Sequence, residues 1–453
     1  MAGSPPLMPR SAKVRDDEAL DPYVPERGDR RYAVTHYDLD LVYRVSSNRL
    51  AGRATLDVSY LEETDRIAVD LAGLRASKVT VAGRAVPWTH RGSRITVRLP
   101  DTAVVGNTTT VSITYAGNPR PARSRWGAVG WEELDDGALV ASQPSGAATW
   151  FPCNDHPSDK ATYRIAIDCD SPYDVVVTGS LTDRRVRGSR TSRVFVQDAP
   201  MATYLAAVHI GQYTRFTLAR EPVRQEVVLP AGLVAPARAD LSRQPRMMEV
   251  FERLFGPYPF ADYTVVVTPD ELEMPLEAQG MATFGPNWLQ GRGREERLVA
   301  HELAHQWFGN SLTIATWRDI WLNEGFACYA EWLWWEVADG IPAHRSAREH
   351  WSRLAALPQD IVIGDPGPAL MFDDRLYKRG ALTLHALRQE SGDPSFFAML
   401  GEWVADNTHG SVTTEAFSEH ASRHLGTVAE ELLDDWIWGA ALPDLRIPAG
   451  GDR

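Results

Sequence analysis

Three residues whose chemistry suits a metal site lie close together: His301, Glu302 and His305 form the pattern H-E-x-x-H. Because positions i and i+4 of a helix lie on one face, a helix here directs both imidazoles toward one ion and places Glu302 beside it. Glu324 follows in the segment N-E-G-F-A and offers a carboxylate as a third ligand. Two histidines and one carboxylate, with a fourth position open to water, are the ligand set of a catalytic zinc site. We therefore expect one Zn2+ per chain, held by His301, His305 and Glu324.

The alternative is an ordinary buried helix with incidental histidines, since H-E-x-x-H also occurs in unrelated chains. Glu324, on a second helical pattern downstream, argues against that alternative. Two helices must then position the ligands, joined through the segment 309–311. Asp319 precedes Glu324 by about one and a half turns, and it is either a residue that orients a ligand or a surface acid. Cys328, beside the second helix, is expected to be a small buried apolar residue.

The sequence pattern from Tyr32 to about residue 215 is that of β-strands. Segments such as THYDLDLVYRV and RATLDVSYL alternate apolar and polar residues between Gly, Asn and Asp turns, which is typical of half-buried antiparallel strands. We therefore predict a β-sandwich-like domain over residues 31–215. Within it, Ser142–Ile165 interrupts the strand pattern with small residues, Pro and Asp, and on these residues alone it is a long connection between strands. Residues 1–30 are rich in Pro and charged residues and are expected to form a flexible arm.

From about residue 240 the pattern becomes helical. The segment MMEVFERLFG is amphipathic and is closed by Gly256, and later helical segments include RLYKRGALTLHALRQESG and VAEELLDDWIWGAALP. The intervening YTVVVT favours a strand. We predict an α-rich second domain with a small sheet over residues 216–447, followed by a tail at 448–453. The expected fold class is α+β and multidomain, with the β domain first.

Composition narrows the possible functions. The chain has 47 basic and 60 acidic residues, a net charge of −13, which argues against nucleic-acid binding. Its three cysteines give no disulfide framework. No apolar run approaches the roughly 20 residues needed to span a bilayer, so we expect no membrane partner. The N-terminus shows no apolar segment typical of a secretory signal, and we therefore expect a cytoplasmic location.

Several segments together resemble the aminopeptidase N type of zinc metallopeptidase, peptidase family M1 (a gluzincin family). HELAHQWFGN and WLNEGFA resemble the family's metal signature, and FGPYPFADY, APMATYLAAVHIG and FPCNDHP resemble its flanking landmarks. The resemblance runs from about Asp29 to Leu445. It implies a thermolysin-like catalytic domain and a zinc aminopeptidase that cleaves the first bond of peptide substrates. It also implies that Glu302 takes a proton from the zinc-bound water.

The resemblance assigns a second catalytic residue, Tyr377, in the segment LYKRGAL. It corresponds to the tyrosine of the family's Y-x-K-G motif, whose hydroxyl suits stabilisation of the oxyanion that forms when water adds to a carbonyl. Here Arg379 replaces the lysine of that motif, which keeps the charge but changes the geometry.

The resemblance also suggests where the substrate amine binds, although the match is incomplete. The family pattern is G-x-M-E-N, and this chain has M-P-L-E-A ending at Ala278, so only the glutamate, Glu277, is retained. Glu273 and Glu271 remain alternatives. A second amine-binding group of the family corresponds to Gln143, which offers a carbonyl acceptor without charge. Amine recognition is then expected to depend more on Glu277.

Two questions stay open at this stage. Relatives continue into a large helical domain that covers the active site, whereas this chain stops just after the catalytic domain, so the cleft is expected to be more open or to be covered by another subunit. The rival interpretations are a zinc endopeptidase of the same fold and a non-catalytic interaction protein. Acetylation of the substrate amine would distinguish the first rival, and a metal assay the second. The preferred N-terminal residue and the oligomeric state do not follow from the sequence.

Overall fold

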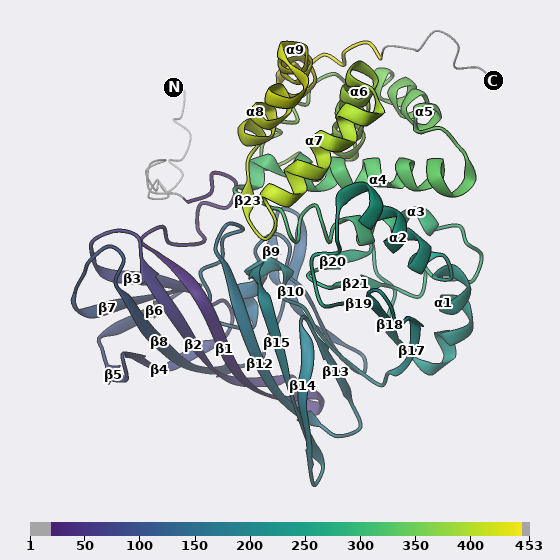
Figure 1. Ribbon diagram of the computed structural model, residues 1–453. Helices are drawn as coiled ribbons and strands as arrows, with labels where there is room; N and C mark the ends of the chain where they lie inside the picture. Colours follow the sequence, from purple (N-terminus) through teal and green to yellow (C-terminus); the bar gives the residue numbers. More distant parts are fainter. Residues whose placement is uncertain (1–19, 446–453) are drawn as a thin grey trace, which may run out of the picture.

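The computed structural model describes residues 20–445, in which a β-rich N-terminal part lies beside a part dominated by helices (Figure 1). The largest N-terminal sheet has eight strands in the order β14-β15-β12-β1-β2-β8-β4-β5, and all its pairs are antiparallel except β1 with β12. Its strands are β1 (Tyr32–Arg44), β2 (Arg49–Tyr60), β4 (Arg75–Val81), β5 (Arg84–Ala85), β8 (Thr108–Gly117), β12 (Lys160–Asp170), β14 (Ser180–Arg187) and β15 (Arg190–Ala202).

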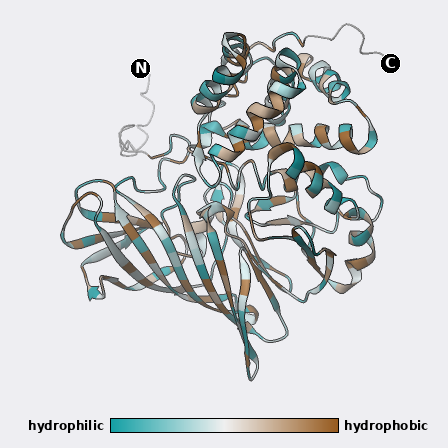
Figure 2. Ribbon diagram, in the orientation of Figure 1, coloured by the Kyte–Doolittle hydropathy of each residue, from teal (hydrophilic) through white to brown (hydrophobic). Residues whose placement is uncertain are grey.

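Two smaller sheets complete the N-terminal part. One has the order β13-β16-β11-β10-β9 and the other the order β3-β7-β6. Their strands are β3 (Thr64–Asp70), β6 (Trp88–Arg91), β7 (Arg94–Ala103), β9 (Ala122–Ser124), β10 (Gly127–Leu134), β11 (Gly137–Ala141), β13 (Asp174–Val177) and β16 (Val208–Gly211). Buried and less buried residues alternate along β12, as the period of a strand requires, and the same alternation of hydropathy is visible along the strands in Figure 2. The predicted antiparallel β domain is confirmed.

A five-stranded sheet begins the second part, in the order β17-β18-β19-β21-β20. Its strands are β17 (Thr214–Ala219), β18 (Arg224–Leu229), β19 (Asp262–Val267), β20 (Leu276–Ala278) and β21 (Met281–Phe284). The chain leaves the N-terminal sheets after β16, so the predicted boundary at residue 215 falls inside β17. The short strand β20 lies at the edge of this sheet and pairs only with β21 among the described strands.

Helices form most of the rest of the second part; in Figure 1 α1 lies beside this sheet and α4 to α9 lie above it. They are α1 (Val234–Asp240), α2 (Gln244–Phe255), α3 (Glu296–Ala304), α4 (Trp321–Asp339), α5 (Ala343–Ala355), α6 (Asp374–Ser391), α7 (Asp393–Asp406), α8 (Thr414–Leu425) and α9 (Thr427–Leu433). The first fourteen residues of α4 are all buried, as expected for a helix surrounded by other elements. The expected α-rich domain after a β domain is therefore confirmed. Among residues 20–445, no helix is long and apolar enough to cross a membrane.

Helices α4 and α6 approach unusually closely where two glycines face each other. A Cβ atom built on Gly325 would lie 2.8 Å from the Cα atom of Gly380, closer than Cβ contacts in proteins come. Each glycine is therefore required by the packing of the other helix. Because Gly325 follows Glu324 and Gly380 lies one turn after Tyr377, this crossing sets the spacing between those two residues.

Residues 20–30 are anchored rather than free. The carboxylate of Asp21 accepts hydrogen bonds from the backbone N–H groups of Tyr23 (2.7 Å) and Trp317 (2.7 Å), the latter in the second part of the chain. The carboxylate of Asp29 accepts one from the backbone of Ala68 (2.7 Å). The prediction of a flexible arm is wrong for these residues. Their acidic side chains were expected to be exposed to solvent, but Asp21 and Asp29 accept hydrogen bonds from backbone N–H groups. Residues 1–19 and the predicted tail at 448–453 lie outside the described residues.

Candidate active site

The histidines of the H-E-x-x-H pattern lie at the C-terminal end of α3, where His301 is in the last turn and His305 is the residue that caps the helix. The two imidazole rings lie 4.7 Å apart at 82°, and both side chains are buried. The Nδ1 atom of His301 bonds the carboxylate of Glu331 (2.8 Å), and Nδ1 of His305 bonds the backbone carbonyl of Phe308 (3.0 Å). Since each acceptor binds a proton on Nδ1, both Nε2 atoms keep a lone pair for a metal ion.

Glu324 lies in the first turn of α4 and brings the third ligand atom to the same point. Its Oε2 atom is 3.4 Å from Nε2 of His301 and 3.5 Å from Nε2 of His305. Ligand atoms bound tetrahedrally at about 2.0–2.1 Å from zinc are separated by roughly 3.3–3.4 Å. One ligand atom from each of these buried side chains falls within a single cluster of 4.8 Å. The spacing and the donor set therefore fit one Zn2+.

The electrostatics of the cluster also favour a cation. Although burial alone would lower the pKa of His305, the carboxyl groups of Glu277, Glu324 and Glu302 raise it to about 10. Burial would raise the pKa of Glu324, and the two histidines lower it below its usual range. Three carboxyl groups thus place negative potential at the two imidazoles. A divalent cation bound where the ligand atoms of His301, His305 and Glu324 converge offsets that potential.

Glu302 lies next to His301 on α3, and its carboxyl group interacts electrostatically with both histidines and with Glu277 and Glu324. The side chain is buried, and its Oε2 atom has no hydrogen-bond partner among the described residues. Burial raises the pKa of this carboxyl group, and the neighbouring histidines oppose that shift. A buried carboxyl group with an unused oxygen beside a metal site is suited to accept a proton from water.

Glu277 and Gln143, the two residues expected at the substrate amine, are in direct contact although 134 positions separate them. The amide of Gln143 donates a hydrogen bond of 2.7 Å to Oε1 of Glu277. Gln143 comes from the long connection between β11 and β12, and Glu277 lies on the edge strand β20. Burial raises the pKa of Glu277, and the nearby His305 lowers it. The connection in the N-terminal part and the edge strand therefore meet beside the metal cluster.

The alternatives for the amine-binding acid lie elsewhere. Glu271 and Glu273 are exposed in the segment before β20, as is Met274, which is 59 % exposed.

The residues that follow α3 fix the strand that carries Glu277. The side chain of Gln306, the residue after His305, accepts a bond from the backbone N–H of Gly280 (2.8 Å) and donates to the carbonyl oxygen of Ala278 (3.2 Å). These two hydrogen bonds therefore fix the position of the strand of Glu277 relative to α3 and its histidines.

Tyr377 lies in the first turn of α6 with its ring stacked against His301, at 6.1 Å and 16°. Burial, with the negative charge of Glu324 and Glu277, raises the pKa of Tyr377 well above its ordinary value. Tyr377 therefore keeps a neutral hydroxyl group that can donate a hydrogen bond.

Arg379 points away from this site, and its guanidinium donates to backbone carbonyls that include those of Trp436 (2.8 Å) and Gly439 (2.6 Å). The arginine in place of the motif's lysine secures the C-terminal segment 435–441.

The structure adds Glu331, which sequence reasoning did not identify. Against the effect of burial, Lys378, His301 and Arg297 hold the pKa of Glu331 at about 2, so the group is a carboxylate that orients His301. Arg297 donates to the same oxygen at 3.1 Å. The sequence did contain a signal for the position of Glu331. It lies seven positions after Glu324, and two helical turns bring both residues to one face of the helix.

Asp319 and Cys328 have different surroundings from the metal site. Asp319 is buried, and its carboxylate accepts bonds from the backbone (3.0 Å) and hydroxyl (2.7 Å) of Thr414. It neither orients a ligand nor lies on the surface, so both alternatives for Asp319 are wrong. It secures the start of α8 instead. Cys328 is buried with a free thiol, as expected.

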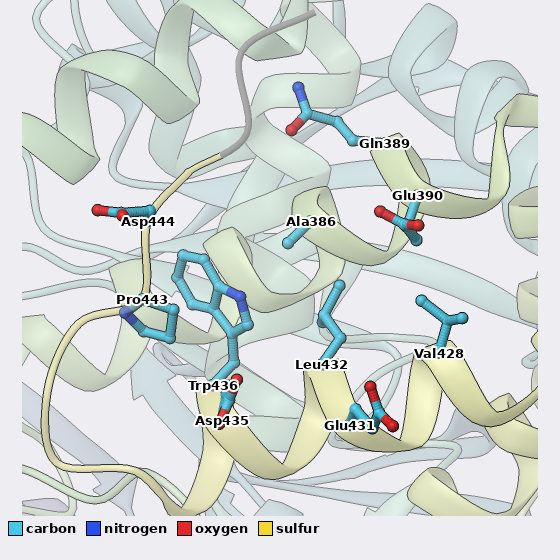
Figure 3. A pocket seen from close by; sticks show the side chains of 10 residues that line it. All are labelled: Ala386, Gln389, Glu390, Val428, Glu431, Leu432, Asp435, Trp436, Pro443 and Asp444. Atoms are coloured by element: carbon cyan, nitrogen blue, oxygen red, sulfur yellow. The ribbon is translucent and has the colours of Figure 1, made fainter.

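A separate hollow of about 240 Å³ lies at the far end of α6 from Tyr377 (Figure 3). Ala386, Leu432 and Trp436 form its apolar wall, and Glu431 and Asp444 are among the acids around it. None of the predicted site residues lines it. The chemistry described above is therefore confined to the cluster between α3, α4, α6 and β20.

Comparison with known proteins points to one family. Residues 239–436 match the peptidase family M1 domain and residues 33–205 match the peptidase M1 N-terminal domain. The M1 zinc metallopeptidase from Deinococcus radiodurans superposes with a TM-score of 0.88 at 34% sequence identity, covering 95% of this chain and 99% of that one. A mutant of that protein, solved with a Tyr-Ser-Ala substrate, also gives a TM-score of 0.88, at 33% identity over 94% of this chain and 98% of that one.

A similar relative among characterised sequences is a leucyl aminopeptidase of Saccharolobus solfataricus. It is 23% identical over 449 residues, which is 93% of this chain and 55% of the relative. The chain thus spans about half the length of the curated relatives it matches.

Proposed function

The chain belongs to peptidase family M1, and we propose that it is a zinc-dependent aminopeptidase that releases the N-terminal residue of peptides. The observation that carries the proposal is the contact between Glu277 and Gln143 beside the cluster of His301, His305 and Glu324. A metal cluster alone supports hydrolysis at any peptide bond. An amine-binding carboxylate next to it selects the first bond, because only the terminal residue carries a free amine.

His301, His305 and Glu324 would hold the zinc ion, which when bound lowers the pKa of water and polarises the scissile carbonyl. The protein's own contribution begins with orientation. Glu331 and the carbonyl of Phe308 hold the imidazoles by their Nδ1 protons, so that neither ring rotates away from the shared point. Burial of all three ligands excludes bulk water from their contact atoms.

Glu302 acts as the general base and then as the general acid. Its unpartnered Oε2 atom accepts a proton from the attacking water. Burial favours the protonated form that results. The same carboxyl group then passes that proton to the nitrogen of the leaving amine, which completes cleavage of the C–N bond.

Tyr377 stabilises the oxyanion. Its raised pKa keeps the hydroxyl protonated, so it can donate a hydrogen bond to the carbonyl oxygen as negative charge develops there. Its place is fixed by the close contact of Gly380 with Gly325, because that contact sets the distance between α6 and the ligand helix α4.

Glu277 and Gln143 bind the substrate amine. Since the Gln143 amide donates to Oε1 of Glu277, its carbonyl oxygen remains available as an acceptor for an ammonium group. The charge-assisted bond from the ammonium to Glu277 is the stronger of the two contacts. The tripeptide bound to the Deinococcus mutant supports short peptides as the substrate class. We also propose a cytoplasmic location, which rests on composition, because the three cysteines of the chain are all free and buried.

The proposal is tested with two matched peptides, one with a free N-terminus and one with an acetylated N-terminus, incubated with the zinc-loaded protein. We expect stepwise release of N-terminal residues from the free peptide and no cleavage of the acetylated one. Equal internal cleavage of both peptides would identify a zinc endopeptidase, which the departures from the family pattern at Met274 and Ala278 would then explain. Absence of cleavage in a fully zinc-loaded protein would favour a non-catalytic role.

A further inference from the structure

A second cleft lies between the N-terminal sheets and the sheet of the second part, away from the metal cluster. It has a volume of about 380 Å³ and is walled by β13, β14 and β15 on one side and β17, β18 and β19 on the other. In Figure 1, β17, β18 and β19 lie to the right of β13 and β14. Four arginines line the cleft, namely Arg184, Arg193, Arg215 and Arg224.

Three carboxyl groups face these arginines and leave positive charge in excess. Asp174 pairs with Arg193 (2.9 Å) and also with Arg215 (2.5 Å). Glu226 pairs with Arg224 (2.5 Å). The third, Asp262, accepts a hydrogen bond from Ser180 (3.2 Å). The carboxylate of Asp174 is thus shared by two guanidinium groups.

Arg184 and Arg193 are in an unusual arrangement. They are direct cross-strand partners in the antiparallel pair β14–β15, where like charges opposite each other are unfavourable. The Arg193 side chain is only 4 % exposed, and its Nη1 atom has no hydrogen-bond partner among residues 20–445. Arg184 forms no ion pair within the same described residues. A buried guanidinium with an unused donor costs free energy unless a ligand satisfies it.

We propose that this cleft binds a small molecule through a phosphate group, with Arg184, Arg193 and Arg215 as the binding residues. Guanidinium groups present planar pairs of donors that match the oxygens of phosphate. A phosphate carries close to two negative charges at neutral pH on one compact group, which can reach both members of the Arg184–Arg193 pair. A dicarboxylate such as malonate carries a similar total charge but spreads it over two separate groups. The bound group also joins the two parts of the chain, because Arg193 lies on β15 and Arg215 on β17.

The test uses isothermal titration of inorganic phosphate into the zinc-loaded protein at fixed ionic strength, with malonate as the carboxylate comparison. Arg184→Glu removes a binding residue that is exposed and lies on an edge strand, so the fold tolerates it. Arg185→Glu makes the same change of charge one position along β14. Arg185 is 65 % exposed, pairs with Asp183 (2.8 Å) and does not line the cleft. Peptidase activity should be unchanged in both variants.

We expect saturable phosphate binding to the unmodified protein and to Arg185→Glu, and at least about tenfold weaker binding to Arg184→Glu. Malonate should bind more weakly than phosphate. The proposal is overturned if the unmodified protein does not bind millimolar phosphate, or if both variants weaken binding equally, which would indicate a general effect of charge. Malonate binding as tight as phosphate would contradict the phosphate assignment.

Discussion

Gly325 on α4 and Gly380 on α6 pack against each other without side chains between them, and a Cβ atom on Gly325 would come within 2.8 Å of the Gly380 Cα atom. The crossing places Glu324, the neighbour of Gly325, and Tyr377, one turn before Gly380, at the same site. The glycine of N-E-G-F-A and the glycine of Y-K-R-G therefore serve one contact. Their role is to set the distance between Glu324, the proposed metal ligand, and Tyr377, the proposed donor to the oxyanion.

Gly325→Ala should destabilise the protein and reduce activity. Alanine normally favours a helix over glycine by about 1 kcal/mol, but here the added methyl group meets backbone that cannot move without separating α4 and α6. Such overpacking typically costs about 1–3 kcal/mol. Gly401→Ala in α7 is the matched control, since its built Cβ atom meets no heavy atom within 4 Å among the described residues apart from its chain neighbours and the backbone of its own helix. Thermal unfolding should show a lower midpoint for Gly325→Ala only, and equal or higher stability of both would refute the steric argument.

Glu331→Gln should weaken zinc binding without unfolding the protein. The carboxylate orients His301 through its Nδ1 proton, and loss of such partners typically lowers metal affinity about 10–100-fold. Asp319→Asn is a suitable contrast, because Asp319 is also buried near Glu324 in sequence but bonds Thr414. Competition with a zinc chelator should distinguish the two variants. Equal zinc affinity in Glu331→Gln and the unmodified protein would contradict the assigned role.

Glu277→Ala should impair substrate binding more than Gln143→Ala. Loss of one partner of a buried, charge-assisted pair typically costs about 2–5 kcal/mol, or roughly 30-fold to several-thousand-fold in kcat/KM. The Gln143 contact is neutral on the protein side and should cost less. Zinc content should be normal in both variants. The exposed Glu273→Ala and Glu271→Ala serve as controls in the same dipeptide assay, and a collapse of either, with Glu277→Ala active, would show that the amine binds elsewhere.

Stability should fall as the pH drops from about 6.5 to about 4, in part because of His209. This residue lies on β16, is fully buried and contacts the hydroxyl of Thr283 through Nε2 (3.1 Å), and burial lowers its pKa from 6.5 to about 4. The unfolded chain therefore binds a proton that the folded protein does not, and each pH unit in this window removes up to about 1.4 kcal/mol. Urea unfolding at several pH values should show a shallower loss for His209→Gln. An identical slope in the variant would mean that His209 is not neutral in the fold.

The metal cluster was predictable from the sequence because its signal is local. Helical periodicity places His301 and His305 on one face, and Glu324 follows in a short, specific segment. The order of a β domain before a helical domain also followed from periodicity alone. The contact of Gln143 with Glu277 could be suspected only from family resemblance, since the strands between them carry no pattern that reports their meeting.

Other features depend on tertiary contacts that no periodicity encodes. Asp319 and Asp21 are acids, yet both are buried because backbone donors from distant elements reach them. Arg379 resembles a conservative replacement for lysine, but its guanidinium donates several hydrogen bonds to backbone carbonyls of the segment 435–441. Helical periodicity places Glu331 on the same face as Glu324, but its contact with the ring nitrogen of His301 is a tertiary contact with another helix. In each case the role of the side chain depends on the group that it contacts in the folded chain.

The measurement that tests the account most directly is zinc content together with kcat/KM in Glu302→Gln, with Glu324→Ala as its comparison. The amide keeps the shape of the side chain but cannot take a proton from water. The account predicts about one zinc per chain in Glu302→Gln and a loss of turnover on a free-amine dipeptide, whereas Glu324→Ala should lose the zinc itself. Near-normal turnover by zinc-loaded Glu302→Gln would contradict the assignment of this residue as the base.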